Sequence, residues 1–131
     1  MAIAVTRDAL GAMRRAAEVA DPLEACGILL GDDTCISAFV ETTNVHPAPE
    51  THFEIDPQAL IDAHRAARTG GPQIVGYFHS HPNGPTEPSD TDRACAAGDG
   101  SIWAIAGSRG VRFFRSGESG FTALCTNVIQ G

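Results

Sequence analysis

The chain has 131 residues, of which 43% are hydrophobic, and its 9 Lys+Arg against 16 Asp+Glu give a net charge of −7. This length predicts one domain, which we place over residues 1–131, and it is sufficient to bury a hydrophobic core. Every basic residue is arginine, which excludes Schiff-base chemistry and a phosphate-binding loop that uses lysine. The isoelectric point near 5.0 argues against a nucleic-acid partner, because nucleic-acid-binding proteins need a basic surface.

The N-terminal segment and the cysteines predict a cytoplasmic protein. Residues 1–8 contain no basic stretch followed by a long apolar one, so they do not resemble a signal peptide. No apolar run approaches the roughly 20 residues that cross a bilayer, so no membrane partner is expected. The cysteines form no C-x-x-C pair, and we expect free thiols rather than a four-cysteine zinc site or disulfides. They are Cys26, Cys35, Cys95 and Cys125.

The first half of the chain predicts two helices and three strands. Thr6 is a suitable N-cap for a helix that Asp21-Pro22 then ends. Asp56-Pro57 is a typical helix start, with the acid as N-cap and proline at the first helical position. The expected elements are a helix over about 7–20, strands over 26–30, 35–41 and 53–55, and a helix from 57 that ends at Gly70-Gly71.

The second half of the chain predicts a central strand followed by shorter elements. Residues 74–78 form the most apolar, β-favouring run and should lie in the middle of a sheet. The late strands are joined by hairpin-length turns, which indicates an α/β fold with a mixed or largely antiparallel sheet. The remaining elements are a loop over 79–88, a short helix over 89–97 that starts at Ser89, and strands over 101–106, 111–116 and 121–125.

Two histidines and an aspartate after the central strand predict a metal site. Residues two apart in a strand point to the same side, so His79 and His81 can present both imidazoles to one point. Asp92 adds a carboxylate after a loop that contains three prolines. Two imidazoles and one carboxylate suit tetrahedral Zn²⁺, with the fourth position open for water, as in catalytic sites.

Each part of this pattern also has a purely structural explanation. A single His-x-His is common on a half-buried strand, and Ser89-x-x-Asp92 is a capping-box variant that a helix start alone explains. Asp92 is then a first-turn acid favoured by the helix dipole. The occurrence of both patterns within the fourteen residues 79–92, directly after the most apolar strand, favours the metal site.

A hydrolytic zinc site needs a group that takes a proton from water, and Glu24 is the best-placed candidate. It lies just before the apolar strand 26–30, although a solvated residue of the Asp21–Glu24 turn is the simpler local interpretation. Antiparallel pairing of strand 26–30 with strand 74–78 would bring Glu24 beside His79. Glu87 and Asp90 are rival bases that we expect to face solvent. His46 and His52, in the loop over 42–52, are candidate borders of a substrate groove.

Together these residues resemble the JAMM (MPN+) metalloprotease motif. Its elements are Glu, then His-x-His-Pro, then Ser-x-x-Asp, which correspond here to Glu24, His79–Pro82 and Ser89–Asp92. The run Glu24–Gly31 is also similar to the Glu-x-Cys-Gly-Leu-Leu-Leu-Gly run of the short prokaryotic members. The resemblance covers roughly residues 24–116, and no ligand position departs from the pattern.

The resemblance implies a fold, an activity and roles for five residues. The fold is a cytidine-deaminase-like three-layer α/β/α arrangement, and the activity is hydrolysis of peptide or isopeptide bonds at the C-termini of ubiquitin-like proteins. His79, His81 and Asp92 would bind Zn²⁺. Glu24 would hold the nucleophilic water as general base, and Ser89 would stabilise the oxyanion.

We therefore expect a zinc metallopeptidase that acts on the C-terminal tail of a ubiquitin-like protein of the sulfur-carrier type. One alternative is a hydrolase that releases cysteine or another small adduct from the C-terminus of a carrier protein. Another is a non-catalytic, zinc-bearing interaction module. A DNA-repair role, also known for proteins with this pattern, is disfavoured by the net charge of −7 and the absence of lysine.

Overall fold

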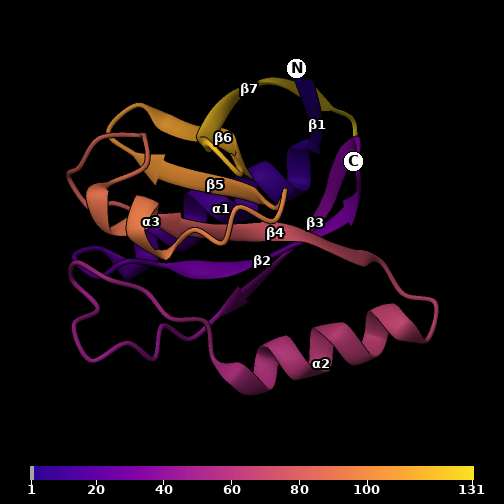
Figure 1. Ribbon diagram of the computed structural model, residues 1–131, viewed down its shortest axis with the longest axis horizontal. Helices are drawn as coiled ribbons and strands as arrows, with labels where there is room; N and C mark the ends of the chain where they lie inside the picture. Colours follow the sequence, from indigo (N-terminus) through magenta and orange to yellow (C-terminus); the bar gives the residue numbers. More distant parts are fainter. Residues whose placement is uncertain (1) are drawn as a thin grey trace.

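The computed structural model describes residues 2–131, which form three helices and seven strands (Figure 1). The helices are α1 (Arg7–Ala20), α2 (Pro57–Arg68) and α3 (Asp90–Cys95). The strands are β1 (Ala2–Thr6), β2 (Cys26–Asp32), β3 (Cys35–Thr42), β4 (Gln73–Ser80), β5 (Ile102–Gly107), β6 (Gly110–Gly117) and β7 (Gly120–Ile129). None of the helices in this part of the chain is long and apolar enough to cross a membrane.

The strands pair in the order β1-β3-β2-β4-β5-β6-β7, and β7 pairs with β1 to close a barrel. The pairs β2–β3, β2–β4, β5–β6 and β6–β7 are antiparallel, whereas β1–β3, β1–β7 and β4–β5 are parallel. This confirms the mixed α/β class. The closed pairing does not confirm the three-layer, cytidine-deaminase-like arrangement that the resemblance implies.

Apart from the bounds of α3 and β7, three details differ from the sequence predictions. Strand β1 was not expected, and it closes the barrel between β3 and β7, whose sequences lie far away in the chain. The expected strand over 53–55 is wrong, because this segment makes only one isolated bridge, between Asn44 and Ile55. Strand β4 continues through His79 and Ser80, because β2 pairs with it as far as Cys26 opposite His79. The local pattern carries no signal for such long-range partners.

Helix α1 covers the inner side of the curved sheet. Thr6 caps it as predicted, since its hydroxyl accepts a hydrogen bond from the Ala9 N–H at 3.2 Å. The helix buries Leu10 and Met13 at helical spacing. They join a core cluster that includes Phe78 of β4 and side chains from most of the other strands.

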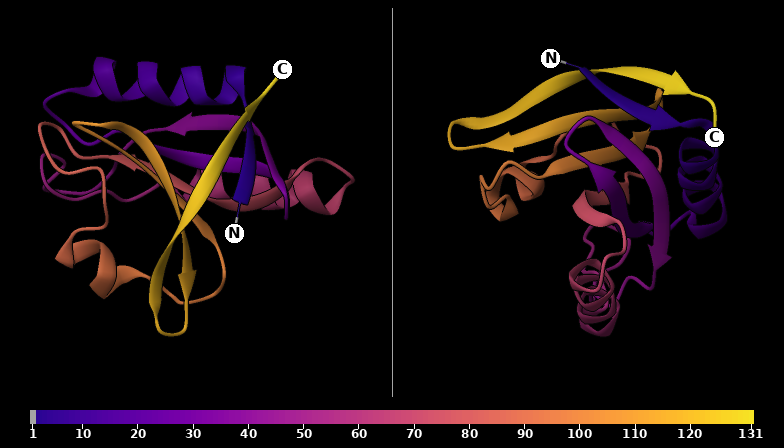
Figure 2. Two further views of the ribbon diagram at one scale, coloured as in Figure 1. Left: turned by 90° about the horizontal axis from the view of Figure 1, so that it is seen from above. Right: turned by 90° about the vertical axis from the view of Figure 1, so that its right-hand side faces the viewer.

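Helix α2 lies on the other side of β2 and β4 (Figure 2). Asp56 caps it and proline occupies its first turn, as predicted. Neighbouring residues of β2 alternate between the two sides, so Leu29 joins the α1 cluster while Ile28 joins a second cluster with Leu60 of α2. The sheet between the two helices is therefore apolar on both faces.

The β2–β4 pair determines where the functional residues meet. The structure confirms the antiparallel pairing of β2 with β4, with Cys26 opposite His79. Beyond this pair, the Ser80 hydroxyl accepts a bond from the Ala25 N–H at 2.8 Å, and the Ser80 N–H donates to the Ala25 carbonyl at 3.1 Å. These two bonds hold the peptide that follows Glu24 directly against the end of β4.

Candidate metal centre and active site

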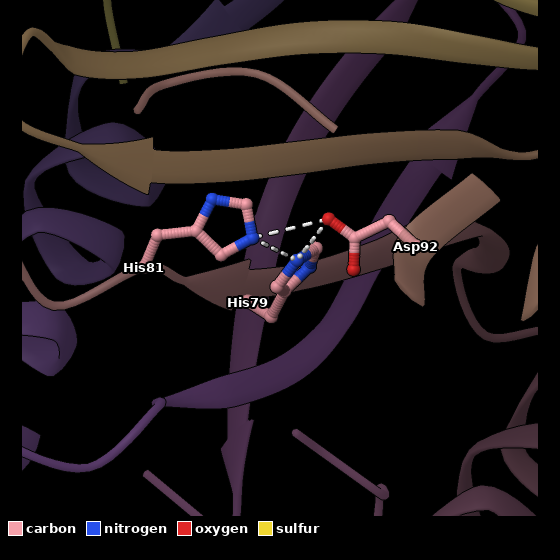
Figure 3. A group of neighbouring side chains, drawn as sticks. All are labelled: His79, His81 and Asp92. Carbon is pink, nitrogen blue, oxygen red and sulfur yellow. Dashed lines mark hydrogen bonds and ion pairs between the residues drawn. The ribbon is translucent and has the colours of Figure 1, made fainter. Parts of the chain in front are cut away.

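The structure brings together one ligand atom from each of His79, His81 and Asp92 (Figure 3). The two Nε2 atoms lie 3.0 Å apart, and Oδ2 of Asp92 lies 3.0 Å from Nε2 of His79 and 3.1 Å from Nε2 of His81. His79 is fully buried and Asp92 is 4% exposed. Figure 3 shows the three side chains converging from the end of β4 and from α3.

The donor set and its spacing fit a zinc ion. Zn²⁺ binds imidazole nitrogen and carboxylate oxygen at about 2.0–2.2 Å, which separates tetrahedral ligand atoms by about 3.3 Å. The three atoms here already lie 3.0–3.1 Å from one another. Three ligand atoms at this distance, two of them on buried residues, have a physical reason to converge when a cation lies between them. His79, His81 and Asp92 would hold that ion.

Ser89 and Asp92 also form the predicted capping box at the start of α3. The Asp92 N–H donates to the Ser89 hydroxyl at 3.1 Å, and the Ser89 N–H donates to Oδ2 of Asp92 at 2.9 Å. The capping and ligand interpretations are therefore compatible, because the same oxygen faces both the Ser89 backbone and the imidazoles. The cap orients the carboxylate toward the histidines and keeps the Ser89 hydroxyl beside it.

The loop after β4 orients the His81 ring. Nδ1 of His81 lies 2.9 Å from the Pro85 carbonyl oxygen, a partner that leaves Nε2 free for a metal. The loop packs closely on β5, since a Cβ at Gly107 would lie 2.8 Å from the Pro85 oxygen. Glycine at this position lets the Pro85 carbonyl reach its place behind His81.

Glu24 lies beside the converging atoms rather than in a solvated turn. It is 6% exposed, and its N–H donates to the Pro49 carbonyl at 2.8 Å. Glu24 and Asp92 line the same cavity of about 100 Å³, together with His46, His52 and Phe53. The rival bases Glu87 and Asp90 are exposed, as expected.

Comparison with known proteins identifies the family. The family model for prokaryotic homologues of the JAB domain matches residues 6–117. The chain belongs to this family. The desampylase of Haloferax volcanii is 33% identical over 102 residues, which cover 76% of this chain and 73% of that protein. A probable TtuB-protein conjugate cleaving protease of Thermus thermophilus is 35% identical over 103 residues, covering 79% and 68% of the two chains.

A solved structure agrees with the fold of this JAB-domain protein. A solution structure of a protein from Desulfitobacterium hafniense superimposes with a TM-score of 0.84 and 25% identity, covering 98% of this chain and 94% of that one. The resemblance to short prokaryotic JAMM proteins is thus confirmed. Two of its relatives are named as enzymes that cleave protein conjugates, and its His79, His81 and Asp92 form a donor set that fits Zn²⁺.

The pKa shifts of His79 and Asp92 in this JAB domain favour the protonation states that bind a metal. Burial lowers the pKa of His79, which keeps its imidazole neutral. Burial opposes ionisation of Asp92, but its hydrogen bonds to the two histidines hold its pKa far below the usual range. Burial also disfavours charge on His81, yet the contact with Asp92 raises its pKa overall, so a metal that binds this ring displaces a proton. Neutral imidazole and ionised carboxylate are the forms that bind a metal.

Burial raises the pKa of Glu24 to about 7, because desolvation penalises the carboxylate. The nearby His81 lowers this pKa and Asp92 raises it further. A general base works best when its pKa is near the working pH, so the environment of Glu24 is suited to proton transfer.

The raised pKa of Glu24 predicts a pH dependence of stability in the metal-free protein. The folded state binds this proton more tightly than the unfolded state, so stability falls as pH rises from about 4.5 to about 7. Glu24→Gln removes this loss. We compare the free energy of unfolding of the variant with that of the wild type. With a discount for partial solvation of the carboxyl, we expect this difference to shift by about 1–2 kcal/mol in favour of the variant as pH rises from 5 to 8.

Urea unfolding of both proteins after chelation measures this difference. The exposed Glu87 is the matched control, because Glu87→Gln changes the same functional group in solvent. A wild type and a Glu24→Gln variant with parallel pH profiles would contradict the buried, raised-pKa state of Glu24.

Three residues of the site region were not singled out by the sequence analysis: Ser80, Asn44 and Phe53. Ser80 joins the end of β4 to Ala25, as described above. The Asn44 side chain donates a hydrogen bond to the backbone carbonyl of Glu24, and the Phe53 ring stacks on His79. Ser80 lies inside the motif His79–Pro82, so its position between the two histidines is a signal that the sequence offers. Asn44 and Phe53 act across the chain, and no local pattern points to them.

Proposed function

We propose that the protein cleaves peptide or isopeptide bonds at the C-terminus of a ubiquitin-like protein of the sulfur-carrier type. In this proposal His79, His81 and Asp92 hold Zn²⁺, Glu24 is the general base and Ser89 is the oxyanion donor. One catalytic domain over residues 1–131 carries these groups. The observation behind the proposal is the convergence of three ligand atoms at 3.0–3.1 Å next to a cavity that Glu24 lines.

The chemistry divides between the metal and the side chains. When bound, Zn²⁺ supplies Lewis-acid polarisation of the scissile carbonyl and a lowered pKa of water, to about 7. The Glu24 carboxylate accepts a proton from the attacking water and then donates it to the leaving amine. The pKa of about 7 given by burial suits both transfers. The backbone bond from Glu24 to Pro49 keeps this side chain at the wall of the cavity.

Ser89 is suited to donate a hydrogen bond to the developing oxyanion. Its hydroxyl accepts a bond from the Asp92 N–H, and a hydroxyl that accepts still has its own proton to donate. Its position in the capping box places that hydroxyl next to the metal ligand Asp92.

We expect Ser89→Ala to lower kcat by about 10²–10³-fold, as loss of one oxyanion donor does elsewhere. The smaller loss of the helix cap costs about 1 kcal/mol of stability. Steady-state kinetics at full zinc occupancy measures the first effect. Ser89→Thr keeps both the hydroxyl and the cap and serves as the matched control. Equal activity of the alanine and threonine variants would exclude the oxyanion role.

The substrate class is supported by the size of the cavity and by the relatives. The cavity beside Glu24 has a volume of about 100 Å³, and this limited space favours small residues at the cleaved bond. One relative is named a desampylase and another a probable TtuB-protein conjugate cleaving protease. Both names support a protein conjugate as the substrate of this chain too.

Three forms of the host's ubiquitin-like carrier test this function: one with a C-terminal peptide extension, one conjugated to a lysine side chain, and one with a cysteine adduct at its C-terminus. Each is incubated with the zinc-loaded protein, and the products are weighed by mass spectrometry. We expect free carrier with an intact C-terminus from the extension and the conjugate. Cleavage of none of the three forms, with zinc bound, would leave a non-catalytic zinc module as the remaining interpretation.

The alternative activity is release of cysteine or another small adduct from a carrier. The small cavity beside Glu24 favours it, because such a leaving group needs little space. Cleavage of the cysteine adduct alone would replace the peptidase by this hydrolase. Both activities depend on the same zinc ligands and the same base, so variants of Glu24 do not separate them.

Two finer points belong to this proposal. We place the reaction in the cytoplasm, which suits the four cysteines, all free thiols in the described chain. We also relate the fold to the cytidine-deaminase-like arrangement. Its support is the apolar clusters on opposite faces of the β2–β4 pair, with α1 on one side and α2 on the other.

A further inference from the structure

The two histidines of the site are oriented in different ways. A metal-binding histidine usually donates its second ring N–H to a carbonyl or carboxylate, which fixes the ring. His81 follows this rule, with Nδ1 at 2.9 Å from the Pro85 oxygen. Nδ1 of His79 is buried and has no hydrogen-bond partner among the described residues. Another interaction must therefore hold the His79 ring.

Two aromatic rings enclose the His79 imidazole. The Phe53 ring stacks on it with centroids 4.3 Å apart and planes inclined by 12°. Trp103 meets it edge to face, at 5.7 Å and 88°. A ring with one stacked neighbour and one perpendicular neighbour has little freedom to turn about its χ2 bond. Phe53 and Trp103 thus fix the plane in which Nε2 of His79 points to the other ligands.

Phe53 is itself held by the side chain of Asn44. The Asn44 amide donates to the His52 carbonyl at 3.0 Å, and its oxygen accepts from the Glu54 N–H at 3.0 Å. Both peptide neighbours of Phe53 are therefore bound by one side chain. The same amide nitrogen donates to the Glu24 carbonyl at 3.0 Å. Asn44 connects the backbone of the base to the loop that carries the stacked ring.

We propose that Phe53 is a positioning residue for His79, whose ring it orients in place of the usual hydrogen bond. Asn44 in turn fixes the position of Phe53 relative to the backbone of Glu24. This inference rests on the proposed zinc ligands. Its consequence is that the loop between β3 and α2, which contributes no ligand, controls the metal affinity of the site. A Phe53 that only filled space would be replaceable by any apolar side chain of similar size.

Zinc affinity of three variants tests the role of Phe53. Phe53→Leu removes the ring, Phe53→Tyr keeps it, and Phe121→Leu removes another ring that contacts Trp103, at 5.1 Å. The metal-free proteins compete for Zn²⁺ with a chromophoric chelator. We expect Phe53→Leu to weaken zinc binding by about 10–100-fold, the usual effect of losing an orienting partner, with Phe53→Tyr and Phe121→Leu close to the wild type. The visible spectrum of the Co²⁺-loaded proteins should change only in Phe53→Leu.

Asn44→Ala provides a second, independent measurement. Because Asn44 reaches His79 only through Phe53, the double variant with Phe53→Leu should bind zinc no more weakly than Phe53→Leu alone. Asn44→Ala should also lower kcat at saturating zinc, since it releases the Glu24 backbone. Additive losses of zinc affinity would show that the two residues act separately and would overturn their coupling.

His79→Ala distinguishes failure of this inference from failure of the proposed site. Loss of zinc in His79→Ala, with less than about threefold weakening in Phe53→Leu, would reject the positioning role alone. Zinc binding that survives His79→Ala would reject the ligand set itself. Equal weakening in Phe53→Leu and Phe121→Leu would assign the effect to general loosening of the aromatic cluster, which also overturns the proposal.

Discussion

Replacing Glu24 with glutamine is expected to lower kcat by about 10²–10⁴-fold, the usual contribution of a general base, while the protein still binds about one zinc ion per chain. The amide keeps the size of the side chain and its backbone bond to Pro49, but it cannot accept and return a proton. Glu24 is separate from the three converging ligand atoms, so zinc binding should persist. Steady-state kinetics and metal analysis on the same sample measure both quantities.

The control for this experiment is Glu87→Gln, which changes an exposed carboxylate in the loop between His81 and Asp92. We expect it to retain wild-type activity and zinc. A Glu24→Gln variant with full zinc and full hydrolysis would rule out Glu24 as the base. Loss of zinc in Glu24→Gln would instead indicate that Glu24 is a fourth ligand.

The second large effect is expected for Asp92→Asn, which should lose both zinc and activity. Oδ2 of Asp92 contacts Nε2 of both histidines and the Ser89 N–H, and the amide substitution removes the negative charge that offsets a cation there. At a free zinc concentration of 1,000 Kd, binding stabilises the wild type by about 4 kcal/mol, which corresponds to a rise in Tm of about 15 °C. The variant should show no rise. Calorimetry with and without zinc measures it.

Asp90→Asn is the matched control, because Asp90 lies in the first turn of the same helix but is exposed. It should keep the zinc-dependent rise in Tm and the hydrolysis. A similar rise in Asp92→Asn and the wild type would remove Asp92 from the ligand set, and the capping box would then be its whole role.

Local features explain why much of the fold was predictable. The caps at Thr6 and Asp56 and the proline in the first turn of α2 are short-range signals, and both helices begin where these residues predict. The strand at 53–55 failed for a physical reason. Phe53 stacks on His79, and Ile55 packs in the apolar cluster between β2 and α2. Both contacts bury apolar side chains without sheet pairing.

The sequence by itself determined the groups that converge at the candidate metal centre. His79 and His81 share a strand end, and Asp92 follows within the same fourteen residues, so strand geometry and a helix cap bring them together. The tertiary structure decided the rest. Glu24 reaches the site only through the register of β2 on β4, and Phe53 reaches His79 only through the loop that Asn44 holds. These contacts depend on the packing of distant segments, whose energy is not encoded in any short stretch of residues.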